Sequence, residues 1–149
     1  MIWKPNVVVA AIIERNGRFL LVEEEADGAV VLNQPAGHLD EGESLLDAVV
    51  REALEETAWH FEPQALVGVY RWPRPGKPVT YLRFAFSGKV TRHDPGRALD
   101  HGIVRAVWMS AEEIRSARPR HRSPQVERCI DDYLAGQRYP LGLLKELTN

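Results

Sequence analysis

The side chains best suited to chemistry lie in one acidic stretch, residues 37–56, with the sequence GHLDEGESLLDAVVREALEE. In a helix that advances 100° per residue, Glu52 and Glu56 share a face with the apolar positions 45, 48 and 49, and Glu55 lies at its edge. Carboxylates on such a buried face repel one another by roughly several kcal/mol unless a cation lies among them. Magnesium is a hard cation that prefers carboxylate oxygens, so the pattern favours a magnesium site.

The competing interpretation is a solvated acidic face held by ion pairs between residues four apart. Such pairs would join Asp47 to Arg51 and Arg51 to Glu55. They account for those three residues, but they leave Glu52 and Glu56 on the apolar face without a partner. A bound cation explains all the carboxylates, and we therefore expect a metal site.

The loop before this helix is suited to the same purpose. Gly37 and Gly42 allow backbone turns that other residues resist, and Gly37 lets its carbonyl approach an ion closely. Glu43 lies eight residues before Arg51, so a charge-assisted contact between them would brace the loop on the helix.

The elements that must position this stretch alternate between strand and helix patterns. An Asn16-Gly17 pair between two apolar runs predicts a β-hairpin. Ser44 and Ser110 have the spacing of helix N-caps, and Gly136 marks the end of the last helix. We expect strands at residues 7–13, 19–22, 30–33, 65–72, 79–90 and 104–109, and helices at 44–57, from 110 and at 123–136. The class is α/β, with helices on a mixed β-sheet.

Composition limits the remaining possibilities. With 149 residues, 44% of them apolar and 27% charged, we expect a single domain over residues 1–149 whose core needs no disulfide. Cys129 is the one cysteine and lies on an apolar helical stripe, so it is expected in the core. A net charge of −2 argues against a nucleic acid polymer or an anionic membrane as partner. The longest apolar run, residues 7–13, is too short to span a membrane, and with no export signal we expect a cytoplasmic protein.

The spacing of the acidic stretch resembles the Nudix box. That pattern is a glycine, a glutamate after five residues, then after seven more Arg-Glu, an apolar residue, any residue and Glu-Glu. It falls here on Gly37, Glu43, Arg51, Glu52, Ala53, Glu55 and Glu56. Residues 33–39 (NQPAGHL) and 136–141 (GQRYPL) resemble the NudJ subgroup of bacterial Nudix phosphatases. Two residues depart from the family pattern: Ala58 replaces the glycine after the box and Trp59 the following aliphatic residue. Because a glycine there normally takes a left-handed conformation, we expect a different helix end, with no proposed ligand altered.

The resemblance implies a Nudix-type α/β/α sandwich that hydrolyses a diphosphate joined to another moiety, using a divalent metal and an attacking water. The cofactor would be Mg²⁺, with Mn²⁺ as the alternative. The implied metal ligands are the carboxylates of Glu52, Glu55 and Glu56 and the carbonyl of Gly37. Arg51 and Glu43 would orient them. The base would be Glu52 or, as in parts of the family, a residue of a later loop, here residues 91–102, which offers Asp94, Asp100 and His101.

The substrate is less clearly encoded. Trp72 and Tyr81 offer aromatic faces for a ring, Arg83 offers a cation for a phosphate, and Phe84, Trp3 and Tyr139 are further aromatic candidates. The resemblance implies small phosphorylated substrates: nucleoside di- and triphosphates, or pyrimidine pyrophosphates of thiamine metabolism. The protein would act as a monomer or a homodimer.

Two other functions compete with hydrolysis. One is a non-catalytic, nucleotide-binding Nudix-like regulatory module, which the intact Arg51-Glu52 and Glu55-Glu56 pairs argue against. The other is a calcium-binding or scaffold domain, but the loop at residues 40–43 lacks the alternating ligands of an EF-hand.

Overall fold

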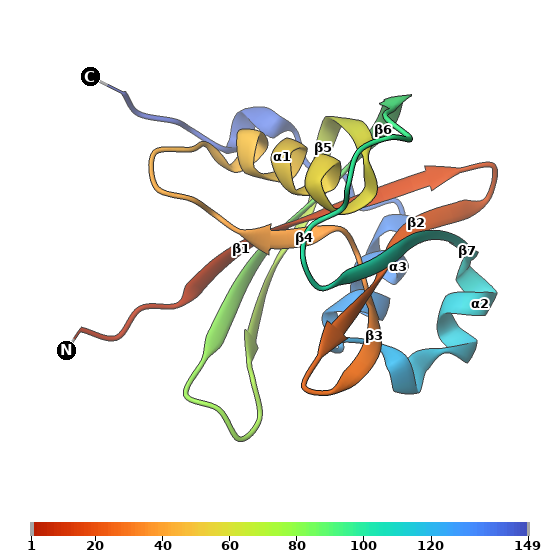
Figure 1. Ribbon diagram of the computed structural model, residues 1–149. Coiled ribbons are helices and arrows are strands. Elements are labelled where there is room, and N and C mark those ends of the chain that lie inside the picture. The colour runs from red at the N-terminus through yellow and green to blue at the C-terminus, as the bar shows by residue number, and fades with distance from the viewer. Residues whose placement is uncertain (1, 149) are drawn as a thin grey trace.

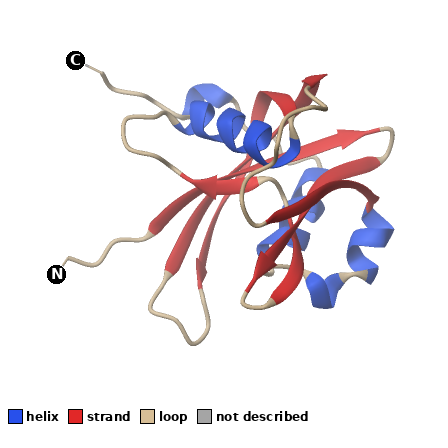
Figure 2. Cartoon of the chain, viewed as in Figure 1, coloured by secondary structure: helices blue, strands red, loops and turns tan. Residues whose placement is uncertain are grey.

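The computed structural model describes residues 2–148 and places helices on both faces of a mixed sheet (Figures 1 and 2). The strands are β1 (Asn6–Arg15), β2 (Arg18–Ala26), β3 (Ala29–Asn33), β4 (Ala36–His38), β5 (Trp59–Pro73), β6 (Thr80–His93) and β7 (Ile103–Ser110). The helices are α1 (Leu45–Thr57), α2 (Ala111–Ser116) and α3 (Gln125–Leu134), with short 3₁₀ helices η1 (Arg118–Arg120) and η2 (Leu141–Leu143). In the part of the chain described, no helix has the length and apolar character needed to cross a membrane.

Strand β1 lies at the centre of the sheet, whose order is β3-β2-β1-β6-β5. It pairs parallel with β6 and antiparallel with β4, whereas its pairing with β2 is confined to the residues beside the hairpin turn. Beyond that turn β2 pairs with β3 and β7 instead. Asn16 and Gly17 both have positive φ, 52° and 77°, as the two-residue hairpin turn requires. The predicted hairpin is therefore confirmed.

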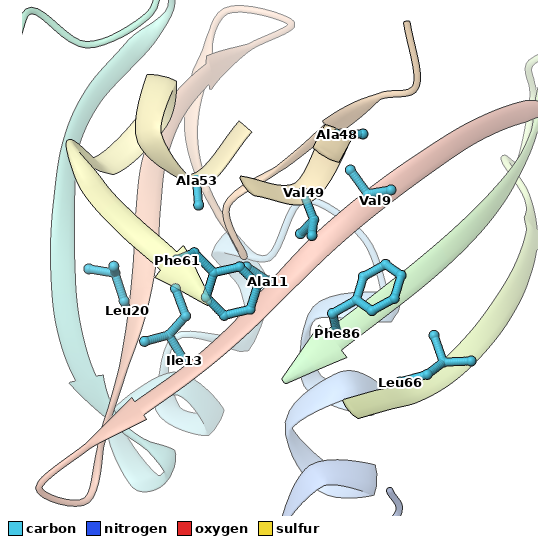
Figure 3. Close-up of a cluster of buried hydrophobic side chains, with 10 residues drawn as sticks. All are labelled: Val9, Ala11, Ile13, Leu20, Ala48, Val49, Ala53, Phe61, Leu66 and Phe86. Atoms are coloured by element: carbon cyan, nitrogen blue, oxygen red, sulfur yellow. The ribbon is translucent and has the colours of Figure 1, made fainter. Parts of the chain in front are cut away.

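The core lies on both faces of β1, because successive side chains of a strand point to opposite sides. One set of buried residues packs beneath α1 and is shown in Figure 3: Val9, Ala11, Ile13, Leu20, Ala48, Val49, Ala53, Phe61, Leu66 and Phe86. The other set packs beneath α2 and α3: Ala10, Ile12, Phe19, Leu21, Val67, Ala85, Ile114, Cys129 and Ile130. This arrangement confirms the predicted mixed sheet between helical layers and the core position of Cys129.

Helix α1 begins and ends at well-defined caps. The Ser44 hydroxyl accepts a hydrogen bond from the Asp47 backbone N–H at 3.0 Å, as predicted for the N-cap. At the other end the expectation of a different helix end was wrong. Ala58 itself adopts the left-handed conformation, with φ 63° and ψ 16°, and donates its N–H to the Leu54 carbonyl. The chain thus keeps the glycine-type cap with an alanine, at a cost of about 1 kcal/mol.

Three local predictions need correction. Residues 36–38 form β4, although their sequence predicted a loop, because β1 supplies the pairing partner. Strand β5 begins at Trp59, six residues before the predicted start, and its pairing with β6 shifts register around Pro63. The helix predicted at residues 123–136 is shorter in the structure, and Leu134, which continues the apolar stripe of Cys129 by its spacing, lies in the last turn of α3 and is 47% exposed.

The β5–β6 pairing supplies a stability test, because Gly88 of β6 faces Pro63 at a register shift. A Cβ on Gly88 would lie 2.0 Å from the backbone oxygen of Glu62, which cannot move without disturbing the strand. We expect Gly88→Ala to destabilise the fold by about 2 kcal/mol or more, measured as a lower unfolding temperature. Gly96→Ala is the matched control, because Gly96 has open space around it. Equal unfolding temperatures for the two variants would contradict this packing.

Candidate active site

The short strand β4 places Gly37 directly against α1. A Cβ on Gly37 would lie 2.2 Å from the Glu52 carboxyl carbon, so only glycine leaves room for that carboxylate. Pairing of β4 with β1 fixes the approach, with Gly37 opposite Val9. The glycine of the predicted metal set therefore has a second effect, since it allows the Glu52 carboxylate to pack against the strand.

The Arg51 guanidinium connects the acidic loop to helix α1 through several hydrogen bonds. Its Nε and Nη2 donate to the two oxygens of Glu43 at 2.8 and 2.7 Å, and Nη2 also donates to the His38 carbonyl at 3.1 Å. Its Nη1 donates to Glu52 at 2.7 Å and to Glu55 at 3.2 Å. The guanidinium lowers the pKa of Glu43 to about 2, and the carboxylates in turn raise the pKa of Arg51. The predicted contact between Glu43 and Arg51 is present, and the two side chains stay charged over the physiological range.

Glu56 has no such cationic partner among the described residues. It is 7% exposed, and its Oε1 accepts a hydrogen bond from the Ala36 backbone N–H at 2.9 Å. Burial raises its pKa to about 9, and the negative charge of Glu52 adds to this effect. Burial also raises the pKa of Glu52, although the hydrogen bond from Arg51 opposes that shift. The two buried carboxylates are thus held in an environment that disfavours their charge.

A residue of the later loop completes the acidic group. Carboxylate oxygens of Glu52, Glu55 and Asp100 all lie within 4.8 Å of one another. The Asp100 backbone N–H donates to the Glu55 carbonyl at 2.9 Å, which anchors the loop to α1. Of the three loop candidates, Asp94 instead contacts His60 at 2.8 Å and Arg92 at 3.3 Å. His101 is exposed and is not part of this acidic group.

A pocket of about 350 Å³ opens beside these carboxylates. Its lining includes Glu52 and Glu56 from α1 and all three residues predicted to bind substrate, Trp72, Tyr81 and Arg83. The rings of Trp72 and Tyr81 stack across β5 and β6, with centroids 5.9 Å apart and an interplanar angle of 18°. The other aromatic candidates, Phe84, Trp3 and Tyr139, do not line this pocket.

Sequence reasoning missed several polar residues of the pocket lining: Glu24, Asn33, Asp40, Arg122, Ser123 and Gln125. Asn33 and Asp40 lie within the stretches singled out above but had no role assigned there, and the other four residues have no characteristic spacing by which a sequence pattern could identify them. Arg83 itself is 3% exposed and donates to Gln34 Oε1 at 2.8 Å and to Asn33 Oδ1 at 2.9 Å. The pocket thus has an acidic wall on α1 and an amide-rich, aromatic wall on β5, β6 and the start of α3.

Comparisons with known proteins agree with this geometry. A family model described as NUDIX domain matches residues 3–129. The chain is 41% identical over 146 residues to phosphatase NudJ of Escherichia coli K12, an alignment that covers 98% of this chain and 94% of that protein. A NUDIX hydrolase from Nitrosomonas europaea shares 54% sequence identity and superposes with a TM-score of 0.95, covering 97% of this chain and 98% of that one.

A more distant structure, a MutT NUDIX hydrolase from Burkholderia pseudomallei, has a TM-score of 0.74 at 20% identity and supports the fold alone, over 87% of this chain and 98% of that one. The family match over most of the chain and the near full-length relatives agree with one another. The chain therefore belongs to the Nudix family of hydrolases, enzymes that cleave diphosphate linkages and use divalent metal ions.

Proposed function

We propose that this hydrolase cleaves the diphosphate linkage of nucleoside di- or triphosphates, or of related pyrimidine pyrophosphates, by attack of water on phosphorus with Mg²⁺ as cofactor and Mn²⁺ as the alternative. The observation that carries the proposal is one pocket with two chemically distinct walls. Glu52 and Glu56 line one side, and Trp72, Tyr81 and Arg83 line the other. A substrate with a charged diphosphate at one end and a ring at the other matches that division.

The donor set fits a divalent cation. Glu52, Glu55 and Asp100 bring carboxylate oxygens to within 4.8 Å of one another, and these are the ligands that Mg²⁺ prefers. Burial raises the pKa values of Glu52 and Glu56, as expected for carboxylates arranged for a cation. We propose Glu52, Glu55 and Glu56 with the Gly37 carbonyl as ligands, and Asp100 as an addition to the predicted set. Once bound, the cation would neutralise diphosphate oxygens and lower the pKa of the attacking water.

The protein's own side chains have separate proposed tasks. Arg51 holds Glu52 and Glu55 by hydrogen bonds and fixes the loop through Glu43, so it positions the carboxylates. We propose that Glu52 or Asp100 accepts a proton from the attacking water, because both carboxylates belong to the same acidic group. Asp94 is a poorer candidate because its carboxylate is bound to His60 and Arg92. Preorganised charges of this kind reduce the barrier because they need not rearrange as the reaction proceeds.

The alternative function, a non-catalytic regulatory module, has no specific observation in its favour. The expectations of cytoplasmic location, of a monomer or homodimer, and of one domain over residues 1–149 stay predictions.

The function is tested with a panel of substrates. We expect Mg²⁺-dependent hydrolysis of nucleoside diphosphates and related pyrophosphates, with release of inorganic phosphate or a monophosphate, because the acidic group is suited to adjacent phosphoryl groups. Activity should vanish in EDTA and return with Mg²⁺. p-Nitrophenyl phosphate, a simple monoester, serves as the control. Cleavage of this monoester as fast as the diphosphates would show that the reaction class is wrong.

A second prediction concerns Glu56→Gln and Glu52→Gln, which keep side-chain size and remove one charge. Turnover should fall by a factor on the order of 10² or more, the scale for loss of a major charge-stabilising group. Magnesium should raise the unfolding temperature of the wild type by mass action and that of the variants much less. Asp47→Asn, on the polar side of α1, is the control and should keep turnover within a few-fold. Near-full activity of Glu56→Gln together with loss in Asp47→Asn would contradict the assignment.

The same variants make a prediction about pH in the absence of metal. The pKa of Glu56 in the fold, about 9, lies above its ordinary value of 4.5. Its contribution to stability is therefore fully present below about pH 4.5 and is lost as the pH rises toward 9. The unfolding temperature of the metal-free wild type should fall as the pH rises over this range, and that of Glu56→Gln should fall less. At pH 8 the variant should equal or exceed the wild type in EDTA; a clearly less stable variant would be the contrary result.

Gly37→Ala tests the contact between β4 and Glu52. The added Cβ would overlap the Glu52 carboxylate, which lies at the end of a flexible side chain and can move aside. We expect the fold to survive, with a metal-free unfolding temperature close to that of the wild type. Displacement of the carboxylate should reduce turnover by a factor on the order of 10². Gly96→Ala, in open space, is the control; full activity of Gly37→Ala would refute the role of this contact.

A further inference from the structure

Two buried polar atoms in the pocket wall have no hydrogen-bonding partner among the described residues. They are Nε of Arg83 and Oε1 of Gln125, one a donor and the other an acceptor. Both residues line the pocket beside Glu52 and Glu56. Because an unpaired buried polar group destabilises the fold, two of opposite type in one wall require an explanation.

The surrounding hydrogen bonds hold both side chains in place. Gln34 accepts from Arg83 Nη1 at 2.8 Å and donates to the Val126 carbonyl at 2.8 Å, so it connects Arg83 to the first turn of α3. Gln125 begins that helix, and its Nε2 donates to the Ser123 hydroxyl at 3.2 Å. The Arg83 guanidinium and the Gln125 amide therefore belong to one connected polar wall, yet the two free atoms do not pair with each other.

Arg83 is also a buried cation without a counter-ion. Its side-chain hydrogen bonds go to the neutral amides of Asn33 and Gln34 and, at 3.9 Å, to the sulfur of Cys129. Burial raises the pKa of Cys129, so that sulfur is a thiol. Within the described chain no carboxylate forms an ion pair with Arg83. Such a group strongly favours a ligand that brings an electron-rich oxygen or nitrogen.

The aromatic pair indicates what else that ligand carries. Trp72 and Tyr81 line the same pocket, and their stacked rings offer flat faces to a planar group. A planar ring whose edge presents an acceptor beside a donor carries the groups that Arg83 Nε and Gln125 Oε1 lack, and its face suits the aromatic pair. Nucleobases have this edge, whereas sugars lack the flat ring and isoprenoid chains lack the polar edge.

We propose that Arg83 and Gln125 read the hydrogen-bonding edge of a nucleobase, with Gln125 as a specificity-determining residue for the reaction. Arg83 Nε donates to the ring acceptor, and Gln125 Oε1 accepts from the adjacent N–H. This inference rests on the proposed function, because it names the class of substrate that the same pocket takes. The diphosphate then extends toward Glu52 and Glu56.

The test compares substrates with and without the ring. For the best substrate among UDP, CDP, GDP and ADP, kcat/KM is measured relative to ribose 5-diphosphate. We expect the wild type to prefer the nucleoside diphosphate. Gln125→Met, which keeps length and removes the acceptor, should reduce that preference roughly tenfold, mainly through KM. Gln64→Met makes the same change at an exposed position of β5 and should leave the preference intact. An equal loss of kcat/KM on both substrates in Gln125→Met would overturn the proposal, and so would a wild type that does not prefer the nucleoside diphosphate.

A second measurement needs neither metal nor hydrolysis. Binding of the four free nucleosides is followed by NMR in EDTA, and Gln125→Met should weaken the tightest of them roughly tenfold, whereas Gln64→Met should not. If no diphosphate is hydrolysed but this loss is seen, the proposed function fails and the base-reading role stands. If diphosphates are hydrolysed and nucleoside binding is the same in wild type and Gln125→Met, the base-reading role fails alone.

Discussion

The contact of Arg51 with several groups at once is the interaction on which the site depends. One guanidinium joins Glu43 and the His38 carbonyl on the loop to Glu52 and Glu55 on the helix. Its planar shape allows the paired contact with Glu43, which a lysine could not make. Without this cation, a loop and a helix that both carry negative charge would repel each other. The acidic surface is therefore stable because one positive charge is fixed within it.

The charge of Arg51 does not compensate all the carboxylates of the site equally. Arg51 neutralises the outer part of the acidic group, whereas Glu56 is more deeply buried, and the Ala36 N–H is its one hydrogen-bonding partner within residues 2–148. The apolar faces of α1 and β1 prevent the helix from turning away, because Ala48, Val49 and Ala53 are packed against the sheet. The core thus holds Glu52 and Glu56 toward the pocket against their own preference for water. Across the pocket, Arg83 is in the opposite situation, as a buried cation among amides.

The sequence was sufficient for the parts of the molecule that depend on local pattern. The hairpin turn, the N-cap at Ser44 and the spacing of Glu52 and Glu56 could be predicted because each follows from short-range geometry. Strand β4 could not, since Ala36–His38 becomes a strand only through β1, nearly thirty residues earlier. The left-handed Ala58 was also missed, because tertiary packing around a buried residue outweighed its local preference.

The polar wall of the pocket could not be predicted from the sequence for a related reason. Asn33 and Gln34 are neighbours in the chain, whereas Arg83 and Gln125 come from two other segments, and the role of such ordinary polar residues emerges only when the fold places them together. Asp100 could be named as one of several loop candidates, but its backbone bond to Glu55 was needed to distinguish it from Asp94. The sequence shows which residue types are present, but it does not show which distant residues the fold brings together.

The parallel pairing of β1 with β6 has a consequence for the order in which the molecule matures on the ribosome. Val7 lies opposite Leu82, 75 positions later, so the central pair of strands closes only when more than half of the chain has been synthesised. The acidic helix, by contrast, is complete at residue 57. For an interval during translation the nascent chain carries its full set of glutamates without the sheet that shields α1 or the loop that brings Asp100. Such late, non-local closure is slow compared with helix formation. The emerging polypeptide is therefore most exposed to misfolding and chaperone capture in this interval, before β6 has docked.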